Sequence, residues 1–290
     1  MESIKNIFFT FEDLKGDVFS QIERNIEDKE SNYGVKTGFK SLDQITLGLQ
    51  KTDLVLLAAR PSVGKTAFAL NIAVNASIYS KKKVAFFSLE MSKEQLALRC
   101  VSLVSKIPIM DIKTGNLKSK DLKLIGKAYE KLLEAKIFID DCTSQTTDEL
   151  ISKLILLKKE DSLDIAFIDY LQLIKPVKSK EIREFEVSEI SRNLKIIAKE
   201  LCIPVVALSQ LNRKVEIRND KRPMLSDLRE SGALEQDSDV VIFLYRESVY
   251  GKTKYKSKSN TEIIIAKHRN GLVGNVFLDF NPEIMEFVEK

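Results

Sequence analysis

Residues 53–66 read DLVLLAARPSVGKT, an apolar run followed by a loop that ends in Gly64-Lys65-Thr66. The apolar run has the length and composition of a buried strand. Residues 67–79, AFALNIAVNASIY, are apolar on most faces and predict a helix. A strand, a glycine-containing loop and a helix in this order are the context that a phosphate-binding loop requires. The sequence therefore predicts a protein that binds a nucleoside triphosphate.

The loop carries the residue types that triphosphate binding needs. Backbone N–H groups of such a loop point at the phosphates, a lysine binds the β- and γ-phosphates, and a hydroxyl binds Mg²⁺. Lys65 and Thr66 stand at those two positions. The usual pattern begins with glycine, and Ala59 stands there instead, which keeps the side chain small. We expect these residues to surround the phosphates: Arg60, Pro61, Ser62, Val63, Gly64, Lys65, Thr66 and Ala67.

Composition is that of an ordinary soluble globular protein. The chain is 44% hydrophobic and 30% charged, with a net charge of +4. Its length of 290 residues permits one large α/β domain with an appendage or two domains. We expect no membrane span, because no apolar run approaches the necessary length. The cysteines, at 100, 142 and 202, are far apart and His268 is the only histidine, so we expect no disulfide framework or zinc site and a cytoplasmic location.

Apolar and polar segments alternate along most of the chain. Strands are predicted near 53–59, 83–89, 136–140, 163–169, 203–209, 239–245, 261–269 and 273–280, and helices near 66–80, 92–104, 119–134, 147–159 and 184–201. This alternation predicts a mainly parallel, twisted sheet covered by helices. After residue 238 we expect strands without intervening helices, and Arg269-Asn270-Gly271 predicts the tight turn of an antiparallel hairpin at the end of the sheet.

The first thirty residues have a different pattern. Phe11, Leu14, Val18, Ile22 and Ile26 recur at three- and four-residue spacing among polar residues. This spacing predicts an amphipathic helix, and the polar residues that follow it predict a tether. The helix either folds back on its own domain or docks in a groove of a neighbouring subunit, and periodicity alone does not choose between them.

Three predicted strands end in polar side chains suited to phosphoanhydride hydrolysis. This reaction needs a metal holder, a group that positions water and a sensor of the γ-phosphate. Asp169 follows an apolar strand in the manner of a Walker B carboxylate, Glu90 follows residues 83–89, and Gln210 follows residues 203–209. The alternative for Glu90 is a capping role for the helix that opens at Ser92.

Two cations lie near the end of the chain, Lys267 and Arg269. They are two residues apart on a predicted strand, so both side chains leave the same face while His268 points to the other. They are either solvated edge charges or a finger that enters the nucleotide site of another subunit.

Six motifs in order resemble those of the bacterial DnaB replicative helicases. They are ARPSVGKT at 59–66, FSLEM at 87–91, IDYLQL at 168–173, LSQLNR at 208–213, MLSDLRESGALEQ at 224–236 and KHRNG at 267–271. The resemblance implies a RecA-like P-loop motor domain that forms a hexameric ring, hydrolyses ATP with Mg²⁺ between subunits and moves 5′ to 3′ on single-stranded DNA.

The resemblance also assigns a role to individual positions. It makes Glu90 the general base, Asp169 the Walker B acid that holds Mg²⁺ with Thr66, Gln210 the sensor, and Lys267 and Arg269 groups that act in trans. It places Arg229, Glu230 and Gly232 in a central-channel loop that follows the DNA backbone, where contacts to phosphates carry no base specificity.

The resemblance further implies a division of the chain and a set of partners. Residues 1–33 become a linker arm whose helix packs on the adjacent motor domain, and residues 34–290 become the motor domain. Primase and a helicase loader become candidate partners. DnaB proteins carry a helical domain ahead of the linker, and Met1 stands almost at the linker, so the sequence is either an excised fragment or a natural short form.

Two rival functions remain at this stage. One is a RecA/RadA-like recombination ATPase, against which the loop at 228–232 and the turn at 267–271 argue. The other is a scaffold that binds ATP to close a ring, against which the full set of hydrolytic candidates argues. Lysines at 252, 254, 256 and 258 alternate strictly and receive no assigned role.

Overall fold

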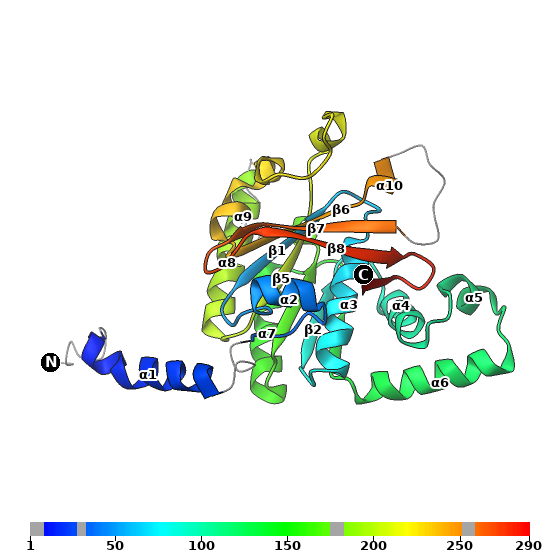
Figure 1. The fold of residues 1–290 in the computed structure, drawn as a ribbon, viewed down its shortest axis with the longest axis horizontal. Helices are drawn as coiled ribbons and strands as arrows, with labels where there is room; N and C mark the ends of the chain where they lie inside the picture. Colours follow the sequence, from blue (N-terminus) through cyan, green and yellow to red (C-terminus); the bar gives the residue numbers. More distant parts are fainter. Residues whose placement is uncertain (1–8, 28–32, 175–182, 251–258) are drawn as a thin grey trace.

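The strand that precedes the phosphate-binding loop, β1 (Leu54–Ala59), lies in the middle of one large sheet (Figure 1). The computed structural model describes residues 9–27, 33–174, 183–250 and 259–290. Within these ranges the sheet has nine strands in the order β3-β2-β4-β5-β1-β6-β7-β8-β9. The other strands are β2 (Val84–Ser88), β3 (Ile137–Asp140), β4 (Ile165–Asp169), β5 (Val205–Gln210), β6 (Val240–Tyr245), β7 (Ser259–His268), β8 (Gly274–Asn281) and β9 (Glu286–Glu289).

The type of strand pairing changes once across the sheet, at β6. Pairing from β3 through β6 is parallel, and pairing from β6 through β9 is antiparallel. This confirms the predicted mainly parallel sheet with an antiparallel hairpin near the end of the chain. Parallel strands need crossover connections, and the helices between them supply these.

Helices cover both faces. They are α2 (Lys40–Thr46), α3 (Lys65–Ile78), α4 (Lys93–Ser105), α5 (Ile109–Thr114), α6 (Ser119–Glu134), α7 (Thr147–Asp161), α8 (Arg183–Glu200), α9 (Gly232–Asp237) and α10 (Glu247–Tyr250), with short 3₁₀ turns η2 (Leu171–Leu173), η3 (Arg213–Ile217) and η4 (Leu225–Ser231). Alternate residues of β1 enter opposite cores. Val55 and Leu57 pack on the α3 side, and Leu54 and Leu56 on the α8 side.

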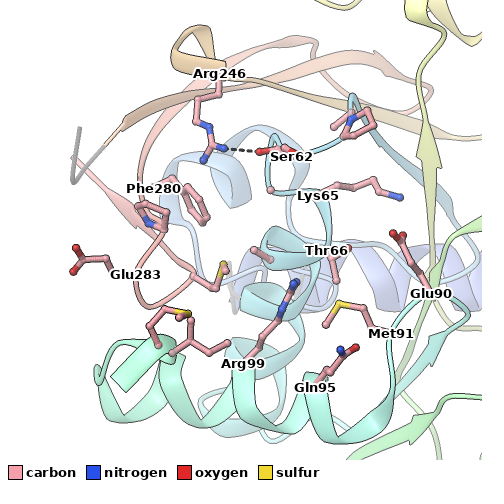
Figure 2. Close-up of a pocket in the computed structure, with 18 of the residues that line it drawn as sticks. Ser62, Lys65, Thr66, Glu90, Met91, Gln95, Arg99, Arg246, Phe280 and Glu283 are labelled. Carbon is pink, nitrogen blue, oxygen red and sulfur yellow. Dashed lines mark hydrogen bonds between the residues drawn. The ribbon is translucent and has the colours of Figure 1, made fainter. Parts of the chain in front are cut away.

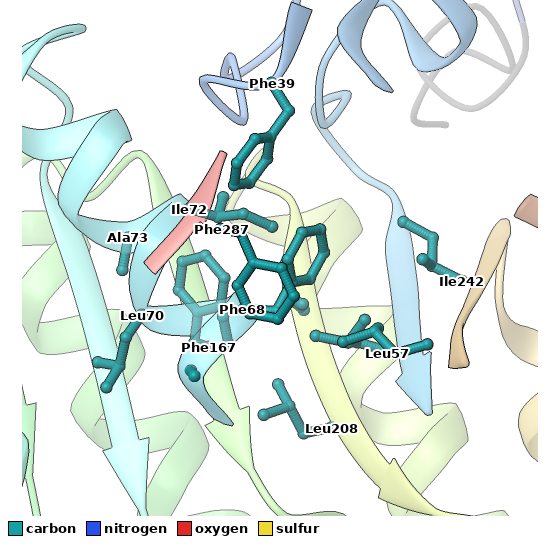
Figure 3. Packing of buried hydrophobic residues seen from close by; sticks show 14 of the residues in the cluster. Phe39, Leu57, Phe68, Leu70, Ile72, Ala73, Phe167, Leu208, Ile242 and Phe287 are labelled. Carbon is teal, nitrogen blue, oxygen red and sulfur yellow. The ribbon is translucent and has the colours of Figure 1, made fainter. Parts of the chain in front are cut away.

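Aromatic rings fill the core beneath α3 (Figure 3). Phe68 stacks on Phe39 with ring centroids 5.3 Å apart and meets Phe287 edge-on at 5.1 Å. The helix begins after Gly64, whose φ of 111° is in the left-handed region that favours glycine. A Cβ at Gly64 would also lie 3.3 Å from the Phe287 ring. The C-terminal strand and the phosphate-binding loop are therefore packed against one another.

The sequence prediction missed the shortest elements. It did not include α2, α5, α9 or β9, and the expectation of strands without helices after residue 238 was wrong, because α10 lies between β6 and β7. A helix of four residues is too short to show a period. Arg269 lies just beyond β7 rather than on it, and the connection to β8 runs from Arg269 to Val273.

The predicted amphipathic helix is present as α1 (Phe11–Glu27), at the side of the molecule opposite α6 (Figure 1). None of its residues is buried. Apolar side chains of the predicted stripe are 39% to 94% exposed, as in Leu14 and Phe11. Within the described ranges, no helix combines the length and apolar character needed to cross a membrane. The alternating lysines at 252–258 lie outside the described residues.

Candidate functional site

The predicted hydrolytic residues of β1, β2, β4 and β5 meet at one edge of the sheet. In the parallel register Ala59 pairs with Gln210, and Ser88 pairs with Asp169. Because these strands run in the same direction, the loops that leave them share the carboxyl edge, where open α/β sheets bind ligands. The sheet thereby brings the phosphate-binding loop, Glu90, Asp169 and Gln210 together.

Lys65 and Thr66 both bind the Walker B candidate. Thr66 Oγ1 donates to Asp169 Oδ2 at 2.6 Å, and Lys65 Nζ lies 3.1 Å from Asp169 Oδ1. The Lys65 ammonium also lies 4.8 Å from the centre of the Tyr170 ring. Burial lowers the pKa of Lys65, and the charge of Asp169 opposes that change. The hydroxyl and carboxylate form the oxygen set that Mg²⁺ prefers, so this site fits the metal.

Glu90 lies one residue beyond a direct link between β2 and β4. Leu89 N donates to Asp169 O at 2.7 Å, which fixes the start of the Glu90 loop beside the Walker B strand. Ser92 and Gln95 form the capping box of α4. The capping role is therefore filled by Ser92, and Glu90 faces the cavity described below.

Gln210 is the exposed last residue of β5. Leu211 N donates to Ala59 O at 3.2 Å, so the chain after Gln210 runs beside the phosphate-binding loop. Gln172, from η2, donates to Ser209 Oγ at 2.9 Å and ties the end of β4 to the end of β5. This arrangement holds the sensor candidate between the loop and the Walker B strand.

A cavity of about 1160 Å³ opens above these residues (Figure 2). Its lining includes Lys65, Thr66, Glu90 and Gln210. Its volume suits a ligand of nucleotide size.

Sequence reasoning missed several further lining residues, among them Gln95, Arg99 and Arg246. Gln95 and Arg99 lie one turn apart on α4, and Figure 2 shows Arg99 rising from that helix toward the loop. Burial lowers the pKa of Arg99, and the charges of Asp169 and Glu90 oppose this. Their four-residue spacing, directly after Glu90, is the signal that indicates a shared face.

Arg246 is the third of these residues and follows β6. It donates to the carbonyl of Ser62 at 2.6 Å, and its guanidinium lies 4.7 Å from the centre of the Phe280 ring (Figure 2). These contacts join the phosphate-binding loop to β8. No local pattern in the sequence reveals them, because they depend on β6 lying beside β1.

Individual loop residues differ in what they present to the cavity. Pro61, Ser62 and Ala67 line it, whereas the Val63 side chain is fully buried in the core. The Arg60 guanidinium is held by Glu216 at 2.6 Å and by the Leu211 carbonyl at 2.6 Å. The side chains of Arg60 and Val63 are thus engaged with the protein, and the Val63 N–H donates to the Arg60 carbonyl at 3.4 Å within the loop.

Lys267 and Arg269 lie away from the other hydrolytic candidates. Val240, the first residue of β6, pairs with His268, the last of β7, so both cations lie at the amino edge of the parallel strands. A six-residue strand separates the two edges by about 20 Å. Lys267 Nζ donates to the carbonyls of Ser238 at 2.7 Å and Glu235 at 2.5 Å. Burial and the nearby Arg269 lower the Lys267 pKa.

The DNA-contact candidates lie in one short segment. Arg229 and Glu230 belong to η4, and Gly232 begins α9, but their side chains are outside what the structure describes. Leu228 and Leu234, on either side, are buried. The segment is therefore flanked on both sides by leucine side chains that pack in the core.

Residues 213–222 include five basic residues, and two of the arginines are paired with carboxylates. Arg218 makes two hydrogen bonds to Asp227, of 2.9 and 2.8 Å, and Arg222 donates to Glu262 at 2.8 Å. These pairs use the arginines to hold the segment in place.

Comparisons with known proteins agree with this architecture. The family model described as DnaB-like helicase C terminal domain matches residues 34–289. The chain is 50% identical to the replicative DNA helicase DnaC of Bacillus subtilis (strain 168) over 96% of its own length and 62% of that protein. It is 49% identical to the replicative DNA helicase DnaB of Geobacillus stearothermophilus, again over 96% and 62%. The chain thus spans less than two thirds of these relatives.

Two solved structures share the fold. One, described as an ATPase domain, superposes with a TM-score of 0.91 and 42% identity, covering 98% of this chain and 99% of that one. The other, a DnaB-like replicative helicase described with its interactions with primase, has a TM-score of 0.87 and 43% identity, covering 93% and 67%. The matched family model and these relatives show that the chain belongs to the DnaB-like helicase C-terminal domain family.

Proposed function

We propose that this chain is the motor of an ATP-dependent DNA helicase that translocates 5′ to 3′ on single-stranded DNA as a hexameric ring. One observation carries the proposal. Asp169 contacts both Lys65 and Thr66 at the carboxyl edge of the sheet, in a chain of the DnaB-like family. Glu90 and Gln210 line the same cavity.

Each residue has a distinct task in ATP hydrolysis. Lys65 neutralises charge on the β- and γ-phosphates, and Thr66 with Asp169 holds Mg²⁺ beside them. The bound Mg²⁺ supplies charge neutralisation at the phosphates. Glu90 orients and deprotonates water, and Gln210 contacts the γ-phosphate. The backbone N–H groups of residues 60–67 complete the phosphate cradle.

Lys267 and Arg269 act on the nucleotide of an adjacent subunit. The length of a six-residue strand, about 20 Å, separates them from the phosphate-binding loop of their own chain, so they are unable to serve that site. An arginine supplied in trans stabilises transition-state charge and contributes about three to five orders of magnitude in turnover.

Ring assembly uses two apolar surfaces on opposite sides of the molecule (Figure 1). The stripe on α1, within the arm at 1–33, is exposed, and one face of α6 of the motor domain exposes Leu122, Tyr129 and Leu133. We take α6 as the surface that receives the α1 helix of the next subunit. Different surfaces that meet head to tail generate a closed ring when the rotation closes.

DNA passes through the centre of the ring and contacts Arg229, Glu230 and Gly232. A short segment that contacts phosphates suits a motor that acts on any sequence. Primase is a candidate partner, because one structural relative is described with its primase interactions, and a helicase loader is a second candidate.

Strand displacement on two matched forked DNAs tests the function. One fork offers a free 5′ tail and the other a free 3′ tail, and each is assayed with ATP and Mg²⁺. We expect displacement only from the fork with the 5′ tail, and none with Lys65→Ala. ATP hydrolysis without displacement on either fork contradicts a helicase and favours the recombination ATPase or the scaffold.

A further inference from the structure

A buried carboxylate lies directly behind the finger candidate Arg269. Asp239, just before β6, has a side chain that is only 6% exposed. Its Oδ2 accepts hydrogen bonds from Leu54 N at 2.8 Å and from Lys195 Nζ at 2.5 Å. Its other oxygen, Oδ1, lies 3.5 Å from Arg269 Nη1. The two oxygens thus face different parts of the protein.

Arg269 is held along one side only. Its backbone N donates to Asp239 O at 2.9 Å, and its Nη2 donates to the carbonyl of Gln236. The side chain is nevertheless 46% exposed. A planar guanidinium that is held at one edge presents its remaining donors in a fixed direction.

We propose that Asp239 is a positioning residue for Arg269, which acts in trans; this inference rests on the proposed function. A free arginine side chain loses rotamer entropy when it becomes ordered, and a partner that orders it beforehand removes part of that loss from the catalytic step. Asp239 supplies this order through Oδ1 and through its carbonyl.

Lys195 limits how far the Asp239 carboxylate neutralises the charge of Arg269. It binds Oδ2 and also donates to the Thr52 carbonyl at 2.8 Å. A second cation on the carboxylate leaves Asp239 less able to neutralise Arg269, whose positive charge the transition state requires. The structural contacts of Asp239 to β1 and α8 run through Oδ2, and the contact to the finger runs through Oδ1.

Rings assembled from two variant chains distinguish a positioning role of Asp239 from a structural role. Lys65→Ala subunits keep the finger and lose their own site, whereas Arg269→Ala subunits keep the site and lose the finger. A mixture hydrolyses ATP where an intact finger enters an intact site. Asp239→Asn keeps the side-chain shape, and it is placed either in the Lys65→Ala chain or in the Arg269→Ala chain, with equal assembly verified by sedimentation.

We expect the position of the substitution to decide the result. In the Lys65→Ala chain, Asp239→Asn disorders the working finger and lowers kcat by about 10- to 100-fold with KM for ATP unchanged. In the Arg269→Ala chain, the finger is already absent. The rate of the mixture therefore stays equal to that of the reference mixture, which contains Lys65→Ala and Arg269→Ala subunits without Asp239→Asn. Equal losses in both placements, or no loss in either, overturn the proposal.

The reference mixture distinguishes this inference from the proposed function. If Lys65→Ala and Arg269→Ala subunits exchange but do not restore hydrolysis, the finger does not act in trans and the role of Asp239 is overturned with it. Displacement of the 5′-tailed fork by the unmodified protein would still support a helicase.

Discussion

Thr66 Oγ1 donates a 2.6 Å hydrogen bond to Asp169 Oδ2, although the two residues are 103 positions apart in the sequence. Lys65 approaches the other oxygen of the same carboxylate at 3.1 Å. The carboxylate therefore already lies against the lysine and hydroxyl that we propose as ligands of the triphosphate and the metal.

A double-mutant cycle measures the Lys65–Asp169 contact. Asp169 is 1% exposed and Lys65 13%, so removal of one partner leaves the other buried without its counter-charge. We expect Lys65→Met and Asp169→Asn to couple by about 1–3 kcal/mol in the free energy of unfolding without nucleotide. Urea titration of the four proteins gives this value, and additive effects would show that the two charges do not interact.

Loss of Arg269 should affect turnover and leave ATP binding intact. Arg269→Ala is expected to reduce kcat by about 10³- to 10⁵-fold, because the finger contributes to the transition state of the neighbouring site. A fluorescent ATP analogue should bind with unchanged affinity. Arg269→Lys serves as the matched variant that keeps charge but loses the planar fork, and we expect only partial recovery. Full activity of Arg269→Ala would exclude a finger role.

Asp53 should make the protein less stable as pH rises. Burial, and then the charge of Asp239, raise the pKa of Asp53 to about 6, while Lys195 and Arg269 oppose the change. The folded protein thus binds more protons than the unfolded chain between about pH 4 and pH 6, and its stability falls as pH rises through that window.

Asp53→Asn removes this titration. Relative to the unmodified protein, it should gain about 2–3 kcal/mol in the free energy of unfolding between pH 4 and pH 7. Urea unfolding at a fixed protein concentration and four pH values measures the difference, in which the titration of other groups cancels. Parallel stability curves for the two proteins would contradict the assigned shift.

The apolar stripe on α1 should hold the ring together. Ile22 is 47% exposed, and Ile22→Asp places a charge in the proposed contact with the next subunit. We expect a lower hexamer fraction in sedimentation velocity. Ser20→Asp adds the same charge on the opposite face of α1 and should leave assembly unchanged. Equal behaviour of the two variants would mean that the stripe does not contact a neighbour.

The fold class and the chemical type of the site follow from local sequence. The β1–loop–α3 unit is continuous from residue 54 to residue 78, so its pattern shows the strand, the glycine turn and the helix without knowledge of their neighbours. Asp169 and Gln210 also follow recognisable buried strands. Short elements such as α10 are not detected from the sequence, because four residues cannot display a helical period.

Tertiary structure alone determines which edge of the sheet each residue occupies. Parallel pairing brings Asp169 to Thr66, and antiparallel pairing of β7 with β6 carries Lys267 and Arg269 to the opposite edge. The contact between Arg246 and Ser62 likewise depends on β6 lying beside β1. The sequence by itself thus determined the strands and the chemistry at their ends, because periodicity and residue type are local. Their assembly depended on burial of both sheet faces and on strand order, which are non-local properties of the packed chain.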